Sequence, residues 1–134
     1  MLNSPRKTKY RKVKKGKLQN LEFKANKLTF GKIGLKAAES GIISSKQIED
    51  ARQAISRKIK RNGKIWIKIF PDVPITSKSV GTRMGKGKGN VSHWGARVRG
   101  GTVIFEVCGV KQATANAAFR TGGAKLPIKT KIFK

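Results

Sequence analysis

The most regular pattern of apolar and polar positions runs from Ser44 to Gly63. Four apolar residues recur there at intervals of three or four, which is the spacing of one helix face. They are Ile48, Ala51, Ile55 and Ile59. Ser44 precedes Gln47 by three residues, and this pair has the composition of a capping box at a helix start. The pattern predicts a helix of about four turns that ends near Asn62-Gly63.

A strict alternation of apolar and polar residues predicts a strand from Lys64 to Phe70. One side of this strand would carry Ile65, Ile67 and Ile69, and the other side Lys64, Trp66, Lys68 and Phe70. The aromatic residues allow two interpretations. They form a stacking platform for unpaired bases, or a neighbouring element covers them as part of the core. We slightly favour the covered arrangement, because large aromatic side chains are usually well buried.

The remaining apolar segments predict shorter elements. Short alternations between Leu18 and Leu35 indicate one or two bent strands. The segments Val91–Arg99 and Thr102–Cys108 predict two further strands, joined by a two-residue hairpin turn at Gly100-Gly101.

Toward the C-terminus, the alanine-rich segment Gln112–Arg120 predicts a short helix with a glycine stop at Gly122-Gly123. The segment Ile128–Phe133 predicts a last strand. Helices are therefore few and strands consecutive. This order is typical of the α+β class, with an antiparallel or mixed sheet and about two helices packed on it.

The charge of the chain indicates its partner. Among 134 residues, 32 are Lys or Arg and six are Asp or Glu, a formal net charge of +26. A compact state must overcome this self-repulsion, and a polyanionic partner would remove it. Nucleic acid is the commonest such partner, because each phosphate neutralised by a cation releases a condensed counterion. A membrane is not expected, because no long apolar stretch or basic helix with a bulky apolar face is evident.

Residues suited to chemistry are scarce. Cys108 is the only cysteine and His93 the only histidine, so one chain can form neither a disulfide nor a cluster of soft metal ligands. Cys108 lies in a predicted strand, His93 has no acid nearby in sequence, and the acids form no close pair. We expect no enzymatic activity and no cofactor, apart from magnesium or potassium ions that RNA itself could hold.

The charge is unevenly distributed along the chain. Residues 1–17 hold eight basic residues, no acid and almost no bulky apolar residue, so they cannot build a core. We interpret them as an arm that becomes ordered along RNA phosphates, in preference to a disordered solubilising tail. Residues 18–134 would form a single RNA-binding domain. Within it, four cations are expected opposite the isoleucine stripe of the first helix, as an RNA contact rather than only a solvated face. They are Lys46, Arg57, Lys60 and Arg61.

A glycine loop, Arg83–Gly89, alternates glycine with cations inside a stretch that has no acid from Val73 to Phe105. Its spacing fits neither a Walker loop nor the dinucleotide fingerprint. Glycines allow positive φ and close approach of backbone amides to a phosphate, and Lys86 and Lys88 add point charges. The guanidinium of Arg83 can fork onto a phosphate or stack on a base. A flexible solvent loop has the same composition, and composition alone does not separate the two readings.

Taken together, these segments resemble the bacterial and organellar large-subunit ribosomal protein L-sixteen family, which is related to the archaeal and eukaryotic L-ten-e proteins. The resemblance covers essentially the whole chain. Its motifs here are the opening Met1-Leu2 with Pro5-Arg6 and Thr8 to Lys12, Phe30-Gly31, Gly34-Leu35-Lys36, Gln47-Ile48-Glu49, Gly63 to Ile67, Phe70-Pro71-Asp72, Pro74-Ile75-Thr76, Arg83 to Asn90 and Ala124 to Pro127.

The resemblance implies an α+β protein on 23S-type ribosomal RNA beside the site where aminoacyl-tRNA is accommodated. The arm and the glycine loop would point toward that site, and the protein would join the subunit late in assembly. Ribosomal RNA, tRNA and neighbouring ribosomal proteins are its expected partners, and a homo-oligomer is not expected. The RNA- or tRNA-binding candidates are Arg6, Lys7, Lys9, Arg11, Lys12, Arg57, Lys60, Arg61, Arg83, Met84, Gly85, Lys86, Gly87, Lys88, Gly89, Arg97 and Arg99.

Some segments depart from the bacterial pattern. Arg97, Arg99 and Gly100-Gly101 make a more basic hairpin, and the stretch Trp94–Val98 is more similar to mitochondrial members. Because the first residues match a mature bacterial start, no cleavable presequence is expected. We expect ribosomes of the mitochondrial matrix, with the plastid stroma or a bacterial cytoplasm as alternatives. A free nucleic-acid-binding module is the rival function, and a phosphate-processing enzyme that uses the glycine loop is a weaker one.

Overall fold

The computed structural model describes residues 4–134, and within them the chain forms seven strands and two helices. In chain order these are β1 (Ile33–Ala37), β2 (Gly41–Ser44), α1 (Ser45–Lys58), β3 (Lys64–Ile67), β4 (Val73–Ser77), β5 (Asn90–Val98), β6 (Val103–Cys108), α2 (Gln112–Gly123) and β7 (Thr130–Phe133). The α+β class predicted from the sequence is confirmed. Neither helix in the described part is long and apolar enough to cross a membrane.

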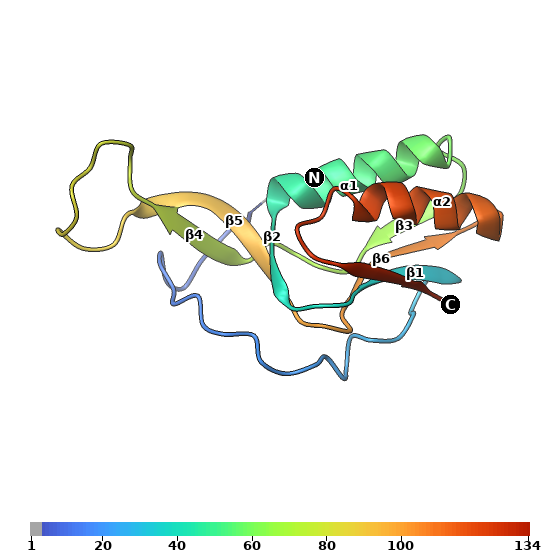
Figure 1. The fold of residues 1–134 in the computed structure, drawn as a ribbon, viewed down its shortest axis with the longest axis horizontal. Coiled ribbons are helices and arrows are strands. Elements are labelled where there is room, and N and C mark those ends of the chain that lie inside the picture. The colour runs from blue at the N-terminus through green and yellow to red at the C-terminus, as the bar shows by residue number, and fades with distance from the viewer. Residues whose placement is uncertain (1–3) are drawn as a thin grey trace.

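The strands form two antiparallel sheets instead of one. A four-stranded sheet has the order β3-β6-β1-β7, and a three-stranded sheet has the order β2-β5-β4. Both helices lie side by side against the four-stranded sheet, whereas β4 and β5 extend away from this body as a long ladder (Figure 1). The apolar core therefore sits at the helical end of the molecule, and the β4–β5 ladder carries its loop away from that core.

The helix α1 begins as predicted. The Ser44 hydroxyl accepts the amide N–H of Gln47, and the Gln47 side chain accepts the amide N–H of Ser44, which completes the capping box. The four apolar residues of the predicted stripe are all buried. The helix ends at Lys58, earlier than predicted, because Lys60 and Arg61 adopt left-handed φ values of 55° and 61°.

The second helix, α2, packs against α1 through small residues. Ala115, Ala118 and Phe119 are buried, and so is Gly122. A Cβ at Gly122 would lie 2.5 Å from Ile55 Cγ1, so glycine allows the two helices to approach closely. The helix ends at Gly123, within the predicted Gly122-Gly123 stop. Neither glycine has a positive φ, so they do not form a left-handed cap, and the small size of Gly122 serves helix packing.

The bent strands predicted between Leu18 and Leu35 are also wrong for most of that segment. Only Ile33–Ala37 is a strand, and residues 18–32 follow an irregular path. The inner strands β6 and β1 are already paired on both edges, so they have no free edge for a further strand. The buried carboxylate of Glu106 holds the segment instead, by accepting the amide N–H groups of Phe30 and Gly31 at 2.7 Å each.

The predicted hairpin at Gly100-Gly101 is a turn between the two sheets. The Thr102 amide donates to the Arg99 carbonyl at 3.1 Å, so a tight turn is present. However, β5 pairs with β2 and β4, while β6 pairs with β1 and β3. The sequence pattern does not predict β2 or β4, and these strands take the edges of β5 that a hairpin partner would have used. The chain of β4 contains Pro74, which is tolerated because β4 is an edge strand.

The predicted strand from Lys64 to Phe70 is shorter in the structure and ends at Ile67. The predicted isoleucine side packs against the core. On the lysine side, Trp66 is partly buried and stacks on Phe30, with ring centroids 5.9 Å apart. A neighbouring segment thus covers Trp66, as the favoured interpretation stated, whereas Phe70 remains 48 % exposed. The last strand is also shorter than predicted and begins at Thr130 instead of Ile128.

Candidate nucleic-acid interface

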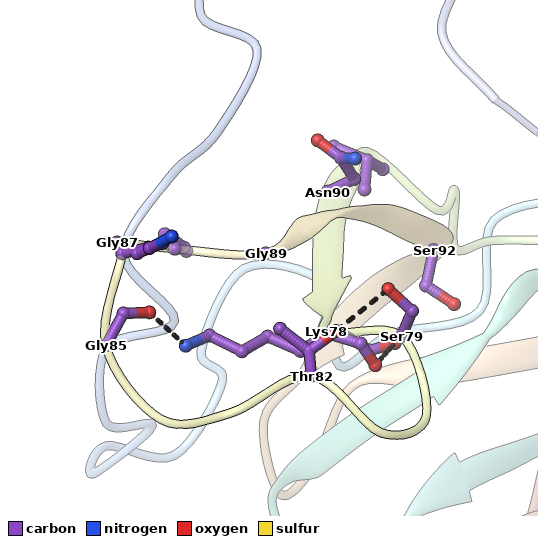
Figure 2. A pocket seen from close by; sticks show the side chains of 12 residues that line it. Lys78, Ser79, Thr82, Gly85, Gly87, Gly89, Asn90 and Ser92 are labelled. Carbon is purple, nitrogen blue, oxygen red and sulfur yellow. Dashed lines mark hydrogen bonds between the residues drawn. The ribbon is translucent and has the colours of Figure 1, made fainter.

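The connection between β4 and β5, residues 78–89, contains the glycine loop and protrudes at the end of the molecule opposite the helices (Figure 1). Lys78, the first residue of this connection, reaches along the loop and donates from Nζ to the Gly85 carbonyl at 2.6 Å (Figure 2). The hydroxyls of Ser79 and Thr82 lie 3.2 Å apart and close a smaller turn (Figure 2). These contacts surround an open hollow of about 410 Å³ whose lining includes the backbone of Gly85 to Gly89.

The glycines of this connection have two different structural roles. Gly85 and Gly87 have φ values of 103° and 80°, and an added Cβ at either would meet nothing within 4 Å. Their conformation, not a lack of space, therefore favours glycine. Gly89 differs, because a Cβ there would lie 2.3 Å from the Ser77 carbonyl oxygen. The positive φ expected from the sequence thus occurs at Gly85 and Gly87, and Gly89 allows close approach of the two strands.

The N-terminal arm lies against the glycine loop. Lys12 Nζ donates to the Lys88 carbonyl at 2.9 Å, and Lys88 Nζ donates to the Val13 carbonyl at 2.7 Å. The guanidinium of Arg97, on β5, donates to the Lys14 carbonyl. We call these three contacts the arm–loop clasp. The clasp brings together the arm, the glycine loop and the basic strand β5. The bonded residues are 75 to 83 positions apart in the sequence.

The other cations of this region point into solvent. Arg6, Lys7, Lys9 and Arg11 of the arm are exposed, and so are the loop residues from Arg83 to Lys88. Met84, at the loop tip, is 94 % exposed. Within residues 4–134, neither Arg83 nor Lys86 forms an ion pair, so both charged groups are available to a ligand. We call the arm from residue 4 to 17, the glycine loop and the β5 arginines Arg97 and Arg99 the arm–loop surface.

A second hollow of about 300 Å³ lies under the arm. It is lined by Pro5, Lys7, Thr8, Lys9, Tyr10, Val13, Asp72, Pro74 and Trp94. Tyr10 is 65 % exposed, and the Lys9 ammonium lies 5.6 Å from its ring centroid. The arm therefore presents an aromatic ring together with its cations, a combination suited to unpaired nucleotides.

The cations predicted on the first helix form a separate group. Arg57 and Arg61 line a hollow of about 240 Å³ together with Arg52, Gln53 and Ser56. Lys60 and Arg61 lie beyond the end of α1, so the predicted single helix face is wrong for these two residues. Lys46 is at the opposite end of the helix. The Arg57 group lies at the helical end of the molecule, far from the glycine loop (Figure 1).

One acidic residue modifies this group. The Glu49 carboxylate lies 2.6 Å from Arg52, and the hydrogen bond from Arg52 lowers the pKa of Glu49. The same bond raises the pKa of Arg52. Arg52 is already paired with Glu49, whereas Arg57 and Arg61 form no ion pair within residues 4–134.

Sequence reasoning missed several residues that organise the interface. Lys78 reaches along the loop to Gly85, and the carbonyls of Val13 and Lys14 accept hydrogen bonds from the clasp cations. Lys78 lies inside the acid-free stretch and only five residues before Arg83, so a wider window would have included it. No local signal predicts which backbone carbonyl a distant lysine will reach.

Neither His93 nor Cys108 lies in a cluster of reactive side chains within the described residues. The His93 ring lies 3.4 Å from the hydroxyl of its neighbour Ser92, and Cys108 ends β6. Among residues 4–134 there is no group of three or more His, Cys, Asp or Glu side chains placed to share a metal ion. The site is a cationic binding surface in which lysine side chains are held by backbone carbonyls.

Comparison with known proteins gives the same assignment along the whole length. The sequence profile of the family "Ribosomal protein L16p/L10e" matches residues 5–133. The "Large ribosomal subunit protein uL16" of Borrelia recurrentis is 52 % identical over 127 residues, which span 95 % of this chain and 92 % of that protein. The protein of the same name from Halorhodospira halophila is 52 % identical over 126 residues, which span 94 % and 92 %. Because the profile matches nearly the whole chain and relatives of similar length are about half identical, the chain belongs to the ribosomal protein L16p/L10e family.

Proposed function

We propose that this protein is a structural constituent of the large ribosomal subunit and that it binds 23S-type ribosomal RNA through the arm–loop surface. The observation that carries the proposal is the arm–loop clasp, because it gathers the basic arm, the glycine loop and Arg97 on one side of the β4–β5 ladder. Membership of a ribosomal protein family makes RNA the polyanion that such a surface serves.

The clasp suggests how the surface is prepared for RNA. Lys12 and Lys88 donate to backbone carbonyls, and within residues 4–134 neither forms an ion pair, so their charge remains available to phosphates. The clasp also restricts the arm before binding, which reduces the conformational entropy that binding must remove. Arg83 and Lys86 then extend from an already positioned loop. Any magnesium or potassium ions at the interface would be held by RNA phosphates.

The finer proposal is that the protruding loop helps to organise the aminoacyl-tRNA site and that the protein acts late in subunit assembly. The loop stands at the far end of the β4–β5 ladder, where it can reach beyond the body of the protein (Figure 1). Its task there would be to position RNA and tRNA. Neighbouring ribosomal proteins would contact other faces of the same domain.

The loop is tested with a variant that combines Arg83→Ala, Lys86→Ala and Lys88→Ala. We expect impaired tRNA accommodation or subunit maturation, with an unchanged circular dichroism spectrum, because these side chains are exposed. The matched control removes three exposed lysines outside the candidate interface, Lys111, Lys125 and Lys129, and so lowers the net charge equally. Normal accommodation and maturation in particles that carry the loop variant would refute the proposed role.

The ribosomal assignment is tested by sedimentation of a gently lysed extract. The protein should migrate with large subunits through moderate salt. A soluble or DNA-bound pool would instead support a free nucleic-acid-binding module.

A further part of the proposal concerns the compartment in which these ribosomes work. The Trp94–Val98 stretch favours the mitochondrial matrix, whereas the relatives described above come from bacteria. Detection of the protein in ribosomes of purified mitochondria would support the mitochondrial proposal, and its absence there would contradict it.

A further inference from the structure

A cluster of two aromatic rings and two lysines lies outside the arm–loop surface, at β3, an edge strand of the four-stranded sheet, and at the irregular segment that packs on it. Phe30 and Trp66 are stacked, with ring centroids 5.9 Å apart and ring planes inclined by 19°. The Lys68 ammonium lies 4.6 Å from the Phe30 centroid, and the Lys64 ammonium lies 5.5 Å from the Trp66 centroid. We call these four residues the aromatic–lysine cluster.

The Phe30 side of this cluster is open to solvent. Phe30 is 57 % exposed, although it covers Trp66. A residue that served only to bury Trp66 would be expected to lose more of its own surface. Phe70, the next aromatic residue in the same alternation, is 48 % exposed. The cluster therefore presents aromatic surface to a ligand in cationic surroundings.

The backbone of Phe30 is held firmly even though its side chain is exposed. Its amide N–H donates to Glu106 Oε2 at 2.7 Å, and the next amide, of Gly31, donates to the same oxygen at 2.7 Å. Glu106 itself is fully buried on β6, directly opposite Trp66. This arrangement positions the ring in advance, so a ligand that stacks on it need not order the segment.

The two lysines have different roles. Lys68 Nζ donates to the Thr29 hydroxyl at 3.1 Å and lies 3.8 Å from Glu106 Oε1, so it is held by the protein. Lys64 is exposed and forms no ion pair within residues 4–134. Lys64 is thus the cation that can bind an anionic group attached to a stacked ring.

We propose that the aromatic–lysine cluster binds an unpaired nucleotide of ribosomal RNA, with the base stacked on Phe30 and the adjoining phosphate near Lys64. Stacking on an aromatic ring accepts any base, and a nearby cation suits the phosphate that accompanies it. This inference rests on the proposed RNA-binding function but concerns a different part of the molecule. The cluster lies beside the four-stranded sheet, whereas the glycine loop extends from the three-stranded sheet.

The test uses the full-length protein with Trp94→Phe, so that Trp66 is the only fluorescent tryptophan. The probes are a six-nucleotide adenosine RNA and an RNA of equal length and charge that lacks bases. We expect the adenosine RNA to quench Trp66 and the baseless RNA to leave its fluorescence nearly unchanged. Phe30→Leu should weaken the quenching isotherm about 5- to 150-fold, the range found for one stacked base. Phe30→Tyr should retain tight binding, because it keeps the ring.

The matched control is Phe23→Leu, since Phe23 is 78 % exposed in the same irregular segment but is not stacked on Trp66. This variant should bind like the parent. Equal binding of both RNAs without a difference in quenching would overturn the stacking inference and leave the general RNA-binding proposal intact. Failure of both RNAs to bind would overturn both.

A second measurement keeps the test valid if the Phe30→Leu variant does not fold well on its own. Large subunits assembled with Phe30→Leu or Phe30→Tyr are probed with a base-modifying reagent. An unpaired RNA base should become reactive with leucine and stay protected with tyrosine. A protein neighbour seated on the cluster would instead leave all RNA reactivities unchanged in the leucine variant, and this result would overturn the proposal.

Discussion

Replacement of Glu106 by glutamine tests how the irregular segment before β1 is attached to the sheet. The carboxylate is fully buried and accepts amide N–H groups from three successive residues. The distances are 3.2 Å from Thr29 to Oε1 and 2.7 Å each from Phe30 and Gly31 to Oε2. Glutamine has nearly the same shape but only one accepting oxygen. If that oxygen takes the position of Oε2, the NH₂ group faces the Thr29 amide and the Lys68 ammonium, donor against donor.

The expected cost follows from these contacts. Hydrogen bonds to a charged acceptor contribute about 1.5–3 kcal/mol each, against about 1 kcal/mol for neutral ones, and a buried unsatisfied donor costs about 1–3 kcal/mol. We therefore expect Glu106→Gln to lower the free energy of unfolding by about 2–4 kcal/mol, out of the about 5–15 kcal/mol typical of a domain. The melting temperature should fall by about 6–20 °C.

The assay is urea unfolding followed by circular dichroism at constant ionic strength. Glu39→Gln is the charge-matched control, because it also adds one unit to the net charge. Glu39 is exposed and accepts a single backbone N–H, from Lys129 at 2.8 Å, which a glutamine oxygen can accept equally well. The control should change stability by less than about 0.5 kcal/mol.

The pH dependence provides an independent check. Burial raises the pKa of Glu106, but the amides of Gly31, Phe30 and Thr29, together with Lys68, outweigh it and leave the pKa lowered. The carboxylate therefore contributes stability above its ordinary pKa of 4.5, and this contribution is lost as the pH falls through the lower folded value. The stability difference between the parent and Glu106→Gln should be constant from neutral pH down to about 5 and shrink below 4.5. A difference below about 0.5 kcal/mol at neutral pH, or one that does not change on acidification, would refute this account.

Two further predictions concern the contact between α1 and α2 and the cations at the C-terminal end of α1. Gly122→Ala places a Cβ 2.5 Å from Ile55 Cγ1. We expect urea unfolding to show a free energy of unfolding lower by about 1–2 kcal/mol, because overpacking exceeds the gain in helix propensity. A more stable variant would contradict the close helix contact. Replacement of Arg57, Lys60 and Arg61 by glutamine should lower RNA affinity and flatten its dependence on salt by about one unit of slope per lost phosphate contact. An unchanged slope would mean that these residues are only solvated.

The helix α1 shows what local sequence determines well. Its start follows from the reciprocal bonds of Ser44 and Gln47, and its buried face follows from helical periodicity. Both features depend on residues within one or two turns of each other. The isoleucine side of β3 was predictable for the same reason, since alternation directly reports which side faces a core. The net charge of +26 likewise indicated a polyanionic partner without any knowledge of the fold.

Strand pairing was not predictable in this way. The segments on either side of Gly100-Gly101 read as a hairpin, but the edges of β6 are occupied by β1 and β3, and those of β5 by β2 and β4. Each of these pairings depends on competition among segments far apart in the chain. The same competition leaves residues 18–32 without a strand partner, and the Glu106 carboxylate attaches them instead.

The sequence by itself therefore determined the α+β class, the family resemblance, the helix signals and the identity of the basic segments. Each of these depends on composition, or on patterns among residues that are close in the sequence. Only the tertiary structure decided that the arm lies against the glycine loop, through Lys12 and Lys88, and that Arg57 stands at the opposite end of the molecule. It also decided that Phe30 stacks on Trp66. The physical reason is that a long, flexible cation or an aromatic ring finds its partner in space, and that partner is set by how the two sheets and two helices pack.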